Sequence, residues 1–327
     1  MSALLEVDHA VKTFSVPAGL FSRRAVSAVD GVSLEIAAGE NLGLVGESGS
    51  GKTTLARCIL GLTDVDSGSI RFDGTEVTGL RGSARREFRR RVQPVFQDPF
   101  ASLDPRWSVG RTIREALDSY RIGTPADRER RTVELLDQVG LSPSYADRLP
   151  SQLSGGQRQR VGIAAALASR PELIVADEPV SALDVSVQAQ VLNLLVDLQR
   201  NLGVAILFVA HDLSVVEHAC QRVAVMYLGH IVETGTATDV FDHPRHPYSE
   251  ALIAAIPYPD PTRRVTRTPL SGEIPSPINP PSGCRFNPRC PLAIDVCRSV
   301  RPPLTAATPT HRAACHVTTP AVPTPVH

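Results

Sequence analysis

Short apolar runs alternate with longer amphipathic stretches along the first 256 residues. Compact runs of aliphatic and β-branched residues occur at 42–45, 173–176 and 205–209, and each is followed by glycine, acidic or polar residues. Continuous runs of this length are typical of strands that are covered on both faces, as in a mostly parallel sheet. Between them lie stretches with helical spacing, such as 52–62 and 185–201. The alternation predicts an α/β fold.

Two segments depart from this alternation. At about 98–160, prolines separate stretches with helical spacing, such as 109–121 and 128–139, which predicts a mainly helical subdomain inserted into the α/β core. At 257–327, proline becomes frequent and four of the six cysteines gather, so we expect little regular secondary structure there. The chain is therefore divided into an α/β domain at 1–256 and a Pro/Cys-rich C-terminal extension at 257–327.

Composition narrows the class of protein without changing this division. Apolar residues make up 42% of the chain and charged residues 21%, as in ordinary globular proteins. The formal net charge is zero, which implies no overall attraction to nucleic acid. We find no secretion signal, and no apolar run approaches the roughly 18 residues that a membrane span needs. Cysteines without a secretion signal indicate a reducing compartment, and we expect a cytoplasmic protein.

A glycine-rich segment follows the first apolar run. Residues 46–53 read G-E-S-G-S-G-K-T, which fits the phosphate-binding pattern G-x-x-x-x-G-K-[ST]. Its glycines allow backbone N–H groups to surround phosphate oxygens, and the following helix N-terminus adds a favourable partial charge. Lys52, one of only two lysines, is predicted to reach the β- and γ-phosphates, and the Thr53 hydroxyl to bind Mg²⁺.

This segment predicts a nucleoside triphosphate site. The residues predicted to form it are Gly46, Glu47, Ser48, Gly49, Ser50, Gly51, Lys52, Thr53 and Thr54.

Two acids end the second apolar run. Asp177 is predicted to hold Mg²⁺, and Glu178 to orient and deprotonate the attacking water. Strands often end in acids, so this pair is informative only because a phosphate-binding loop precedes it in an α/β chain.

A second anion-binding helix start is predicted at 153–157, which reads L-S-G-G-Q. Ser154 lies near the helix cap, where backbone N–H groups face outward. One ATP has no evident use for two such helix starts in one chain. The second is therefore predicted to face the nucleotide of another subunit, through Ser154, Gly155, Gly156 and Gln157.

With these motifs the chain resembles the ABC-type ATPases, a P-loop family in which L-S-G-G-Q is the signature motif and two domains enclose two ATP molecules. The resemblance implies four further roles. Gln97 is the Q-loop glutamine that contacts Mg²⁺ and the attacking water, and Asp184 lies in the D-loop that crosses the dimer interface. His211 contacts the γ-phosphate, and Phe14 stacks on adenine, although a lone Phe is more often a core residue.

The resemblance covers nearly the whole chain and is closest to the dipeptide/oligopeptide importer ATPases. The segments that carry it are 176–190, 211–217, 244–249, 272–277 and 280–290. It implies an ATP-hydrolysing subunit that is peripheral on the cytoplasmic face of the inner membrane.

The resemblance also implies partners: a second, distinct ATPase subunit, two transmembrane permease subunits and an extracytoplasmic solute-binding protein, with no nucleic acid. Peptides are the implied solute, and nickel, glutathione or another solute are the alternatives. A soluble ABC ATPase that acts on DNA or the ribosome, and a nucleotide-binding iron–sulfur sensor, are the rival functions.

The cysteines of the extension form a separate candidate site. No C-x₂-C pair is present among Cys284, Cys290, Cys297 and Cys315, which disfavours an ordinary zinc ribbon. Four thiolates can hold zinc or a [4Fe–4S] cluster. The resemblance favours the cluster, and unmetallated thiols remain a third alternative.

Two weaker features receive structural interpretations. Residues 81–91 carry six arginines, and a solvated helix face is favoured over contact with RNA or lipid. His243 and His246 alternate with prolines, which predicts a surface turn rather than a metal site.

Overall fold

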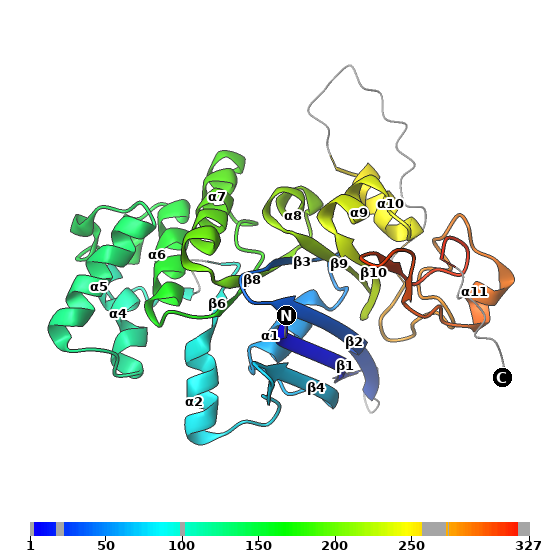
Figure 1. Ribbon diagram of the computed structural model, residues 1–327, viewed down its shortest axis with the longest axis horizontal. Helices are drawn as coiled ribbons and strands as arrows, with labels where there is room; N and C mark the ends of the chain where they lie inside the picture. The colour runs from blue at the N-terminus through cyan, green and yellow to red at the C-terminus, as the bar shows by residue number, and fades with distance from the viewer. Residues whose placement is uncertain (1–2, 18–22, 99–101, 257–272, 274, 320–327) are drawn as a thin grey trace, which may run out of the picture.

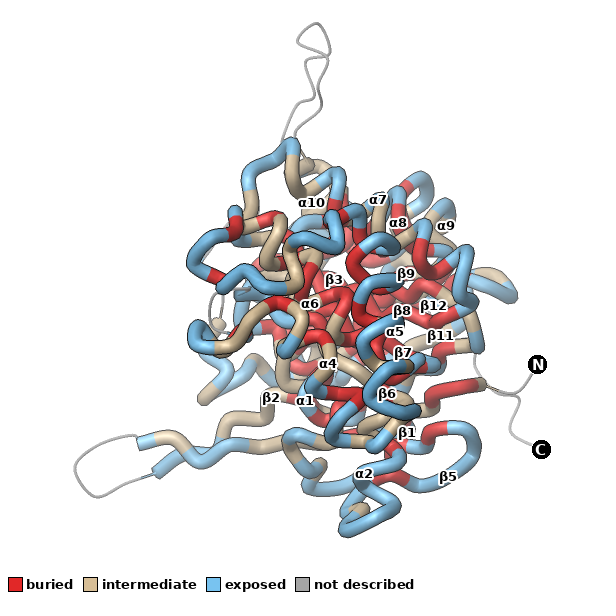
Figure 2. Tube along the Cα trace, turned by 90° about the vertical axis from the view of Figure 1, so that its left-hand side faces the viewer, coloured by how far each residue is buried: buried red, intermediate tan, exposed pale blue. Residues whose placement is uncertain are grey.

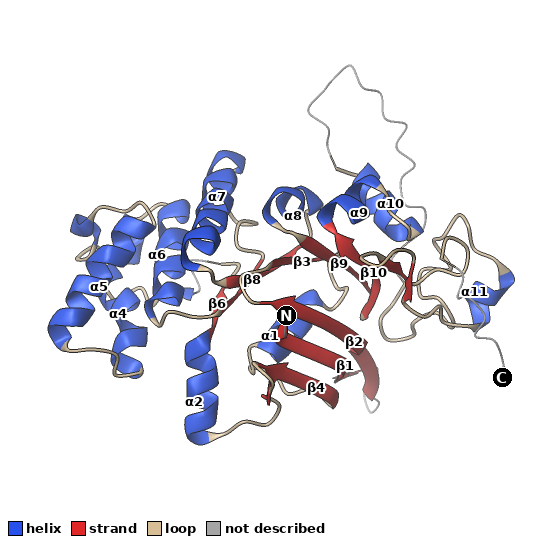
Figure 3. Ribbon diagram, viewed as in Figure 1, coloured by secondary structure: helices blue, strands red, loops and turns tan. Residues whose placement is uncertain are grey.

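The computed structural model describes residues 3–17, 23–98, 102–256, 273 and 275–319. Two sheets lie at its centre, with helices arranged around them (Figures 1 and 3). Strands and helices alternate along the chain through most of the larger sheet, so the predicted α/β fold is confirmed.

The larger sheet has eight strands among the described residues. Its strands lie in the order β11 (Thr305–Ala306), β12 (Arg312–Ala313), β10 (His230–Thr236), β9 (Arg222–Tyr227), β3 (Asn41–Val45), β8 (Ala205–Ala210), β7 (Leu173–Asp177) and β6 (Val92–Val95). From β9 to β6 neighbouring strands are parallel, whereas β9, β10, β12 and β11 pair antiparallel. The three apolar runs seen in the sequence are strands of the parallel part.

Both faces of the parallel part are buried, as its continuous apolar runs predict (Figure 2). Successive side chains of a strand point to opposite faces. Leu42 and Leu44 of β3 belong to one apolar core, while Ile206 and Phe208 of the neighbouring β8 belong to the other. The first core continues into the smaller sheet, and the second into the surrounding helices.

The smaller sheet is antiparallel, with β2 (Arg23–Ala37), β1 (Ala3–Pro17), β4 (Ser67–Phe72) and β5 (Thr75–Glu76) in that order. We did not predict it from the sequence. In β1, buried Leu5 and Val7 flank the less buried Glu6, so apolar and polar positions alternate. A strand with one buried face produces such alternation, not the continuous run that reveals the parallel strands.

The helices predicted at 52–62, 109–121, 128–139 and 185–201 are present near those bounds. The helix bounds are α1 (Lys52–Ile59), α2 (Gly82–Arg91), α4 (Val109–Ser119), α5 (Pro125–Gln138), α6 (Gly155–Ala168), α7 (Val185–Leu202), α8 (Leu213–Ala219), α9 (Ala237–Asp242), α10 (Pro247–Ala254) and α11 (Asp295–Ser299). The last four of these helices, α8 to α11, were not predicted. The short 3₁₀ helices η1 (Pro143–Tyr145) and η2 (Pro150–Gln152) precede α6. No helix within the described ranges combines the length and apolar character needed to cross a bilayer.

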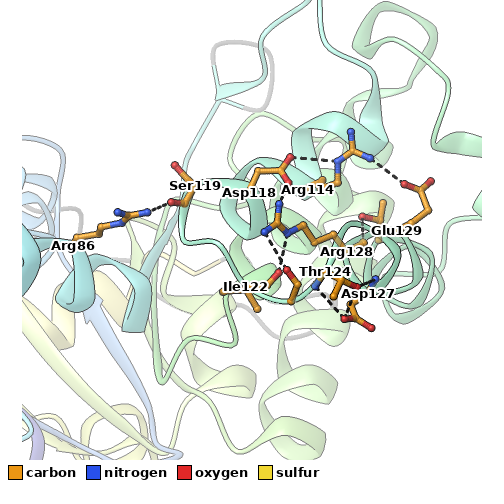
Figure 4. Close-up of polar contacts among 11 residues, drawn as sticks. Arg86, Arg114, Asp118, Ser119, Ile122, Thr124, Asp127, Arg128 and Glu129 are labelled. Carbon is orange, nitrogen blue, oxygen red and sulfur yellow. Dashed lines mark hydrogen bonds and ion pairs between the residues drawn. The ribbon is translucent and has the colours of Figure 1, made fainter.

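Helices α4, α5 and α6 pack on one another at one end of the molecule (Figure 1). Arg114 of α4 contacts Glu129 of α5 at 2.9 Å, and Arg128 of α5 contacts Asp118 of α4 at 2.7 Å (Figure 4). Arg86 of α2 donates a hydrogen bond to the Ser119 carbonyl at the end of α4. The arginine-rich helix α2 is largely exposed, as predicted. Its hydrogen bond to Ser119 also connects it to the group formed by α4, α5 and α6, which we call the helical layer.

The C-terminal extension has little regular secondary structure among its described residues, as expected from its prolines. It is nevertheless joined to the larger sheet, because β12 pairs with β10 through Glu233–Ala313 and Thr234–Arg312. Figure 1 shows the extension beside β10, at the end of the molecule opposite the helical layer.

Candidate active site

The strand order brings four loops to one edge of the larger sheet. Neighbouring strands β3, β8, β7 and β6 are parallel and in register at their ends, with Val45 opposite Ala210 and Asp177 opposite Val209. The loops after these strands carry the phosphate-binding motif, His211, Glu178 and Gln97 respectively. Ligands of open α/β sheets bind outside the carboxyl ends of such strands.

The phosphate-binding loop has a backbone that only glycine tolerates at its end. Gly51 precedes α1 with a φ of 105°, and a Cβ at this position would lie 2.0 Å from the Ala28 carbonyl oxygen. No side chain caps the start of α1. Its first backbone N–H groups are therefore available to an anion, in line with the ordinary property of a helix N-terminus.

Lys52 is only 4% exposed at the first position of α1. Its Nζ donates to the carbonyl oxygens of Gly46 at 2.7 Å and Glu47 at 3.0 Å. Burial lowers the pKa of Lys52, while the acids Glu178, Asp177 and Glu47 oppose this shift. The ammonium group thus lies inside the loop, near the acids at the end of β7.

Thr53 and Asp177 meet across the site. The Thr53 hydroxyl donates to Asp177 Oδ1 at 3.2 Å, and burial raises the pKa of Asp177 despite this hydrogen bond. A hydroxyl and a carboxylate at this spacing are oxygen donors of the kind that Mg²⁺ prefers. The two residues fit a magnesium site.

Glu178 lies between the two other residues of the predicted catalytic group. Gln97 Nε2 donates to Glu178 Oε2 at 2.9 Å, and His211 Nδ1 lies 3.2 Å from Glu178 Oε1. The backbone of Glu178 has a φ of 48°, which is uncommon for a non-glycine residue, and its N–H donates to the Val209 carbonyl at 2.9 Å. Glu178, Gln97 and His211, which are far apart in sequence, are therefore brought together.

The signature motif forms the start of α6. Ser154 is its N-cap: its hydroxyl accepts from the Gln157 N–H, and the Gln157 side chain accepts from the Ser154 N–H. Gly156 lies against α7, since a Cβ there would be 2.4 Å from Val187 Cγ1. Asp184 caps α7 from an exposed position without a side-chain hydrogen bond. The signature motif and the predicted D-loop are thus neighbours within this chain.

The signature motif and the phosphate-binding loop lie in different parts of the molecule. Helix α6 belongs to the helical layer, whereas α1 lies between the two sheets (Figure 1). The side-chain hydrogen bonds of Gln157 reach Ser154 and Tyr145, all within the helical layer.

Phe14 stands 41% exposed on β1, with Lys12 Nζ 5.7 Å from its ring centroid. It is therefore not a core residue.

The extension's cysteines gather without forming a metal site. All four are free, and the Cys284 N–H donates to the Cys297 carbonyl at 2.9 Å. Burial raises the pKa of the Cys284 thiol to about 11, and the other three cysteines add to this shift. Across the described residues, no three Cys, His, Asp or Glu side chains are arranged to hold a metal ion. The present geometry does not fit the predicted [4Fe–4S] cluster or its zinc alternative.

Sequence reasoning missed two residues that contact the phosphate-binding loop, and it missed the burial of a third residue, His246. Arg289 forms an ion pair with Glu47, and the Tyr248 hydroxyl accepts a hydrogen bond from the Glu47 N–H. His246, which the prolines suggested to be in a surface turn, is only 2% exposed and caps α10. No local pattern identifies Arg289 and Tyr248 as neighbours of the loop, because their partner Glu47 is far away in the sequence.

Comparisons with known proteins identify the family of this chain. The family model described as "ABC transporter" matches residues 29–181, and the model described as "Oligopeptide/dipeptide transporter, C-terminal region" matches residues 232–297. The probable peptide ABC transporter ATP-binding protein y4tS of Sinorhizobium fredii is 53% identical over 98% of this chain and 91% of its own. The oligopeptide transport ATP-binding protein OppF of Escherichia coli is 50% identical over 86% of this chain and 85% of its own.

The fold is similar to that of a solved ATP-binding cassette. A dimeric cassette in a post-hydrolysis state, bound to ADP and Pi, matches with a TM-score of 0.64 and 29% identity, over 71% of this chain and 98% of that one. The similar fold, the motifs and the extent of these matches lead to one conclusion. The chain belongs to the ATP-binding subunits of ABC transporters, in the dipeptide/oligopeptide importer family.

Proposed function

We propose that this chain hydrolyses ATP at the carboxyl edge of its larger sheet and uses the hydrolysis to power peptide import. One observation carries the proposal. Lys52 follows β3, whereas Asp177 and Glu178 lie at the end of β7, two strands away in the same parallel sheet. The three residues nevertheless lie close enough for both acids to oppose the lowering of the Lys52 pKa. Gln97 and His211 complete the group through their contacts with Glu178.

The phosphate-binding loop would hold the triphosphate through its backbone N–H groups and Lys52. Thr53 and Asp177, with Gln97 nearby, would hold Mg²⁺, which neutralises charge on the β- and γ-phosphates when bound. The 3.2 Å contact between Thr53 and Asp177 supports this assignment.

Glu178 is the proposed general base. One oxygen of its carboxylate accepts a hydrogen bond from the Gln97 amide, and the other oxygen lies beside His211. A base held in this way can orient a water molecule and accept its proton as the water attacks the γ-phosphate. Gln97 orients the carboxylate and the water, and His211 contacts the γ-phosphate.

The second half of each ATP site is proposed to come from another subunit. The start of α6, with Ser154, Gly155, Gly156 and Gln157, lies away from this chain's own phosphate-binding loop. Asp184 lies beside it, exposed at the start of α7. The similar solved cassette is dimeric. A head-to-tail pair would place each signature motif against the other subunit's nucleotide, and Phe14 would stack on the adenine of its own.

Membrane permease subunits are the proposed targets of the resulting motion. The protein is then peripheral on the cytoplasmic face of the inner membrane, together with a distinct ATPase subunit and an extracytoplasmic solute-binding protein. Relatives named for peptide import support peptides as the solute. Nickel, glutathione or another solute is the alternative, because nothing in the proposed ATP site selects a solute.

The proposed division of the chain places the ATPase domain at 1–256, with a helical subdomain at about 98–160, and the extension at 257–327. The packing of α4, α5 and α6 supports the helical subdomain. A metal at the four cysteines is not part of the proposed function, because their present arrangement does not fit one.

The test is gentle extraction of the tagged chain from native membranes, followed by mass spectrometry of the proteins that co-purify. Two multi-spanning permeases and a second ATPase would support the importer, and the solute on the associated binding protein would identify the cargo. Ribosomal or DNA-repair proteins without any membrane protein would overturn the transporter and leave only the ATPase.

A further inference from the structure

A side chain of the C-terminal extension reaches the phosphate-binding loop. Arg289 donates from Nη1 to Glu47 Oε2 at 2.7 Å and from Nη2 to Glu47 Oε1 at 3.0 Å. The Arg289 side chain is 5% exposed and that of Glu47 21% exposed. This two-bond geometry is the strongest form of an arginine–carboxylate contact, and it fixes the orientation of both side chains.

Aromatic side chains surround this ion pair. The Arg289 guanidinium lies 6.0 Å from the Tyr227 ring centroid and 5.9 Å from that of Phe286. Tyr248 packs against both rings, with centroid distances of 4.6 and 5.5 Å, and its hydroxyl accepts from the Glu47 N–H at 2.7 Å. Glu47 is therefore held by its side chain and by its backbone.

Glu47 in turn contacts the lysine of the loop. Its carbonyl oxygen accepts a hydrogen bond from Lys52 Nζ at 3.0 Å. A chain of contacts thus leads from the extension, through Arg289 and Glu47, to the ammonium group proposed to bind the phosphates. A displacement of Glu47 would move a ligand of Lys52.

The negative charge of Glu47 would oppose phosphate binding, and the guanidinium of Arg289 neutralises it. A carboxylate within a phosphate-binding loop repels the triphosphate, and this repulsion is strong where protein rather than water separates the charges. The paired guanidinium cancels the charge and turns the carboxylate toward the extension. The loop can then present Lys52 and its backbone N–H groups without a competing negative charge.

We propose that Arg289 is a positioning residue for ATP, which neutralises and orients Glu47 so that the extension forms part of the nucleotide site. This inference rests on the proposed phosphate-binding loop. It assigns the extension a role in the ATPase cycle, because any motion of the segment around Arg289 would alter the affinity for ATP.

The test compares Mg²⁺–ATP dissociation constants of full-length variants by isothermal titration calorimetry. Arg289→Met should weaken ATP binding about tenfold, because it leaves the Glu47 charge beside the phosphates. Glu47→Gln removes that charge and should tighten binding up to about threefold, since the guanidinium then attracts the phosphates. The double variant Glu47→Gln/Arg289→Met should regain most of the affinity lost in Arg289→Met.

A matched control is Arg285→Met in the same segment. Arg285 pairs with Asp30, and the two side chains are 9% and 26% exposed, close to the values for Arg289 and Glu47, but Asp30 lies outside the phosphate-binding loop. We expect Arg285→Met to lower the melting temperature without changing the ATP dissociation constant. If Arg289→Met fails to fold, Arg289→Lys takes its place, with a smaller loss of affinity restored by Glu47→Gln.

Equal weakening by Arg289→Met and Glu47→Gln would overturn the proposal, because it would show a bridge that only supports the fold. An equal loss in Arg285→Met would overturn it as well. Lys52→Ala, measured in parallel, tests the proposed phosphate-binding loop separately from the role of Arg289. If Lys52→Ala weakens ATP binding and Arg289→Met does not, only the role of Arg289 fails. If Lys52→Ala has no effect, the proposed phosphate-binding loop fails.

Discussion

The two candidate anion sites of this chain are both helix N-termini, yet they differ in construction. Helix α1 begins at Gly51, which offers no capping side chain, and the loop before it is held by Lys52, Arg289 and Tyr248. Helix α6 begins at Ser154, whose side chain and that of Gln157 satisfy each other's backbone N–H groups. The loop before α1 is held by contacts with buried side chains, whereas Ser154 at the start of α6 is exposed.

The difference indicates which site is complete within one chain. Around α1, the groups proposed to hold the phosphates, Mg²⁺ and the attacking water all come from this chain. Thr53 contacts Asp177, and Glu178 contacts Gln97 and His211. At α6 the Ser154 hydroxyl accepts from one of the backbone N–H groups that an anion would need, and the remaining contacts of the proposed site would come from another subunit. We therefore expect changes near α1 to affect ATP binding by the isolated chain, and changes at α6 to affect hydrolysis in the assembly.

Glu178→Gln should have the largest effect on turnover. Because the amide keeps the shape of the side chain but cannot accept the proton, kcat for ATP should fall about 10²- to 10⁴-fold with little change in ATP affinity. Steady-state phosphate release and equilibrium binding measure the two quantities. The control is Glu172→Gln, just before the start of strand β7, which should leave kcat unchanged. Full turnover in Glu178→Gln would show that Glu178 is not the general base.

Lys52→Ala should weaken ATP binding by the isolated chain about 10- to 100-fold. The reason is the loss of charge-assisted hydrogen bonds, each of which contributes about 1.5–3 kcal/mol. Fluorescence titration with a labelled ATP analogue measures the dissociation constant. Arg200→Ala removes an exposed positive charge from the last turn of α7 and should have no effect. An unchanged affinity in Lys52→Ala would place the phosphates elsewhere.

His246→Asn should change the pH dependence of the protein's stability. Burial lowers the pKa of His246 to about 3. Below the unfolded pKa of about 6.5, the unfolded chain therefore binds a proton that the folded chain does not. This residue's contribution to the free energy of unfolding falls by about 1.4 kcal/mol per pH unit as the pH decreases toward 3.

Asparagine can still cap α10 without titrating, so His246→Asn should remove this part of the slope between pH 6.5 and 5. Urea unfolding across that range measures it. His243→Asn changes an exposed histidine of the same segment and should leave the slope as it is. A slope that is unchanged in His246→Asn would show that groups other than His246 are responsible.

Ser154→Ala should have the smallest effect on the isolated chain. The loss of the cap costs about 1 kcal/mol of stability, and ATP affinity should be unchanged, because this helix start is proposed to serve a second subunit. Thr124→Ala is the matched control, since Thr124 caps α5 with the same arrangement in the same helical layer. Both variants should lose similar stability, but only Ser154→Ala should lose ATPase activity in the assembled complex. Weaker ATP binding by the isolated Ser154→Ala chain would contradict the comparison.

Most of the larger sheet could be predicted, because strands buried on both faces leave continuous apolar runs in the sequence. Strands β3, β7 and β8 lie within one residue of their predicted bounds. The smaller sheet escaped prediction because β1 and β2 have one solvated face and several bulges, which disturb the alternation. The prediction of a surface turn at His246 was wrong, since the backbone of this segment is bound by the buried Glu233.

The sequence by itself determined the chemistry of the phosphate-binding loop, the acids after β7 and the start of α6. These motifs are local, and short-range backbone geometry dictates which residues they need. Tertiary structure decided which distant groups meet them. Arg289 pairs with Glu47 across 242 positions, and Gln97 meets Glu178 across 81. Such pairs depend on the order of strands and the path of the chain between them, and no local pattern of residues records either.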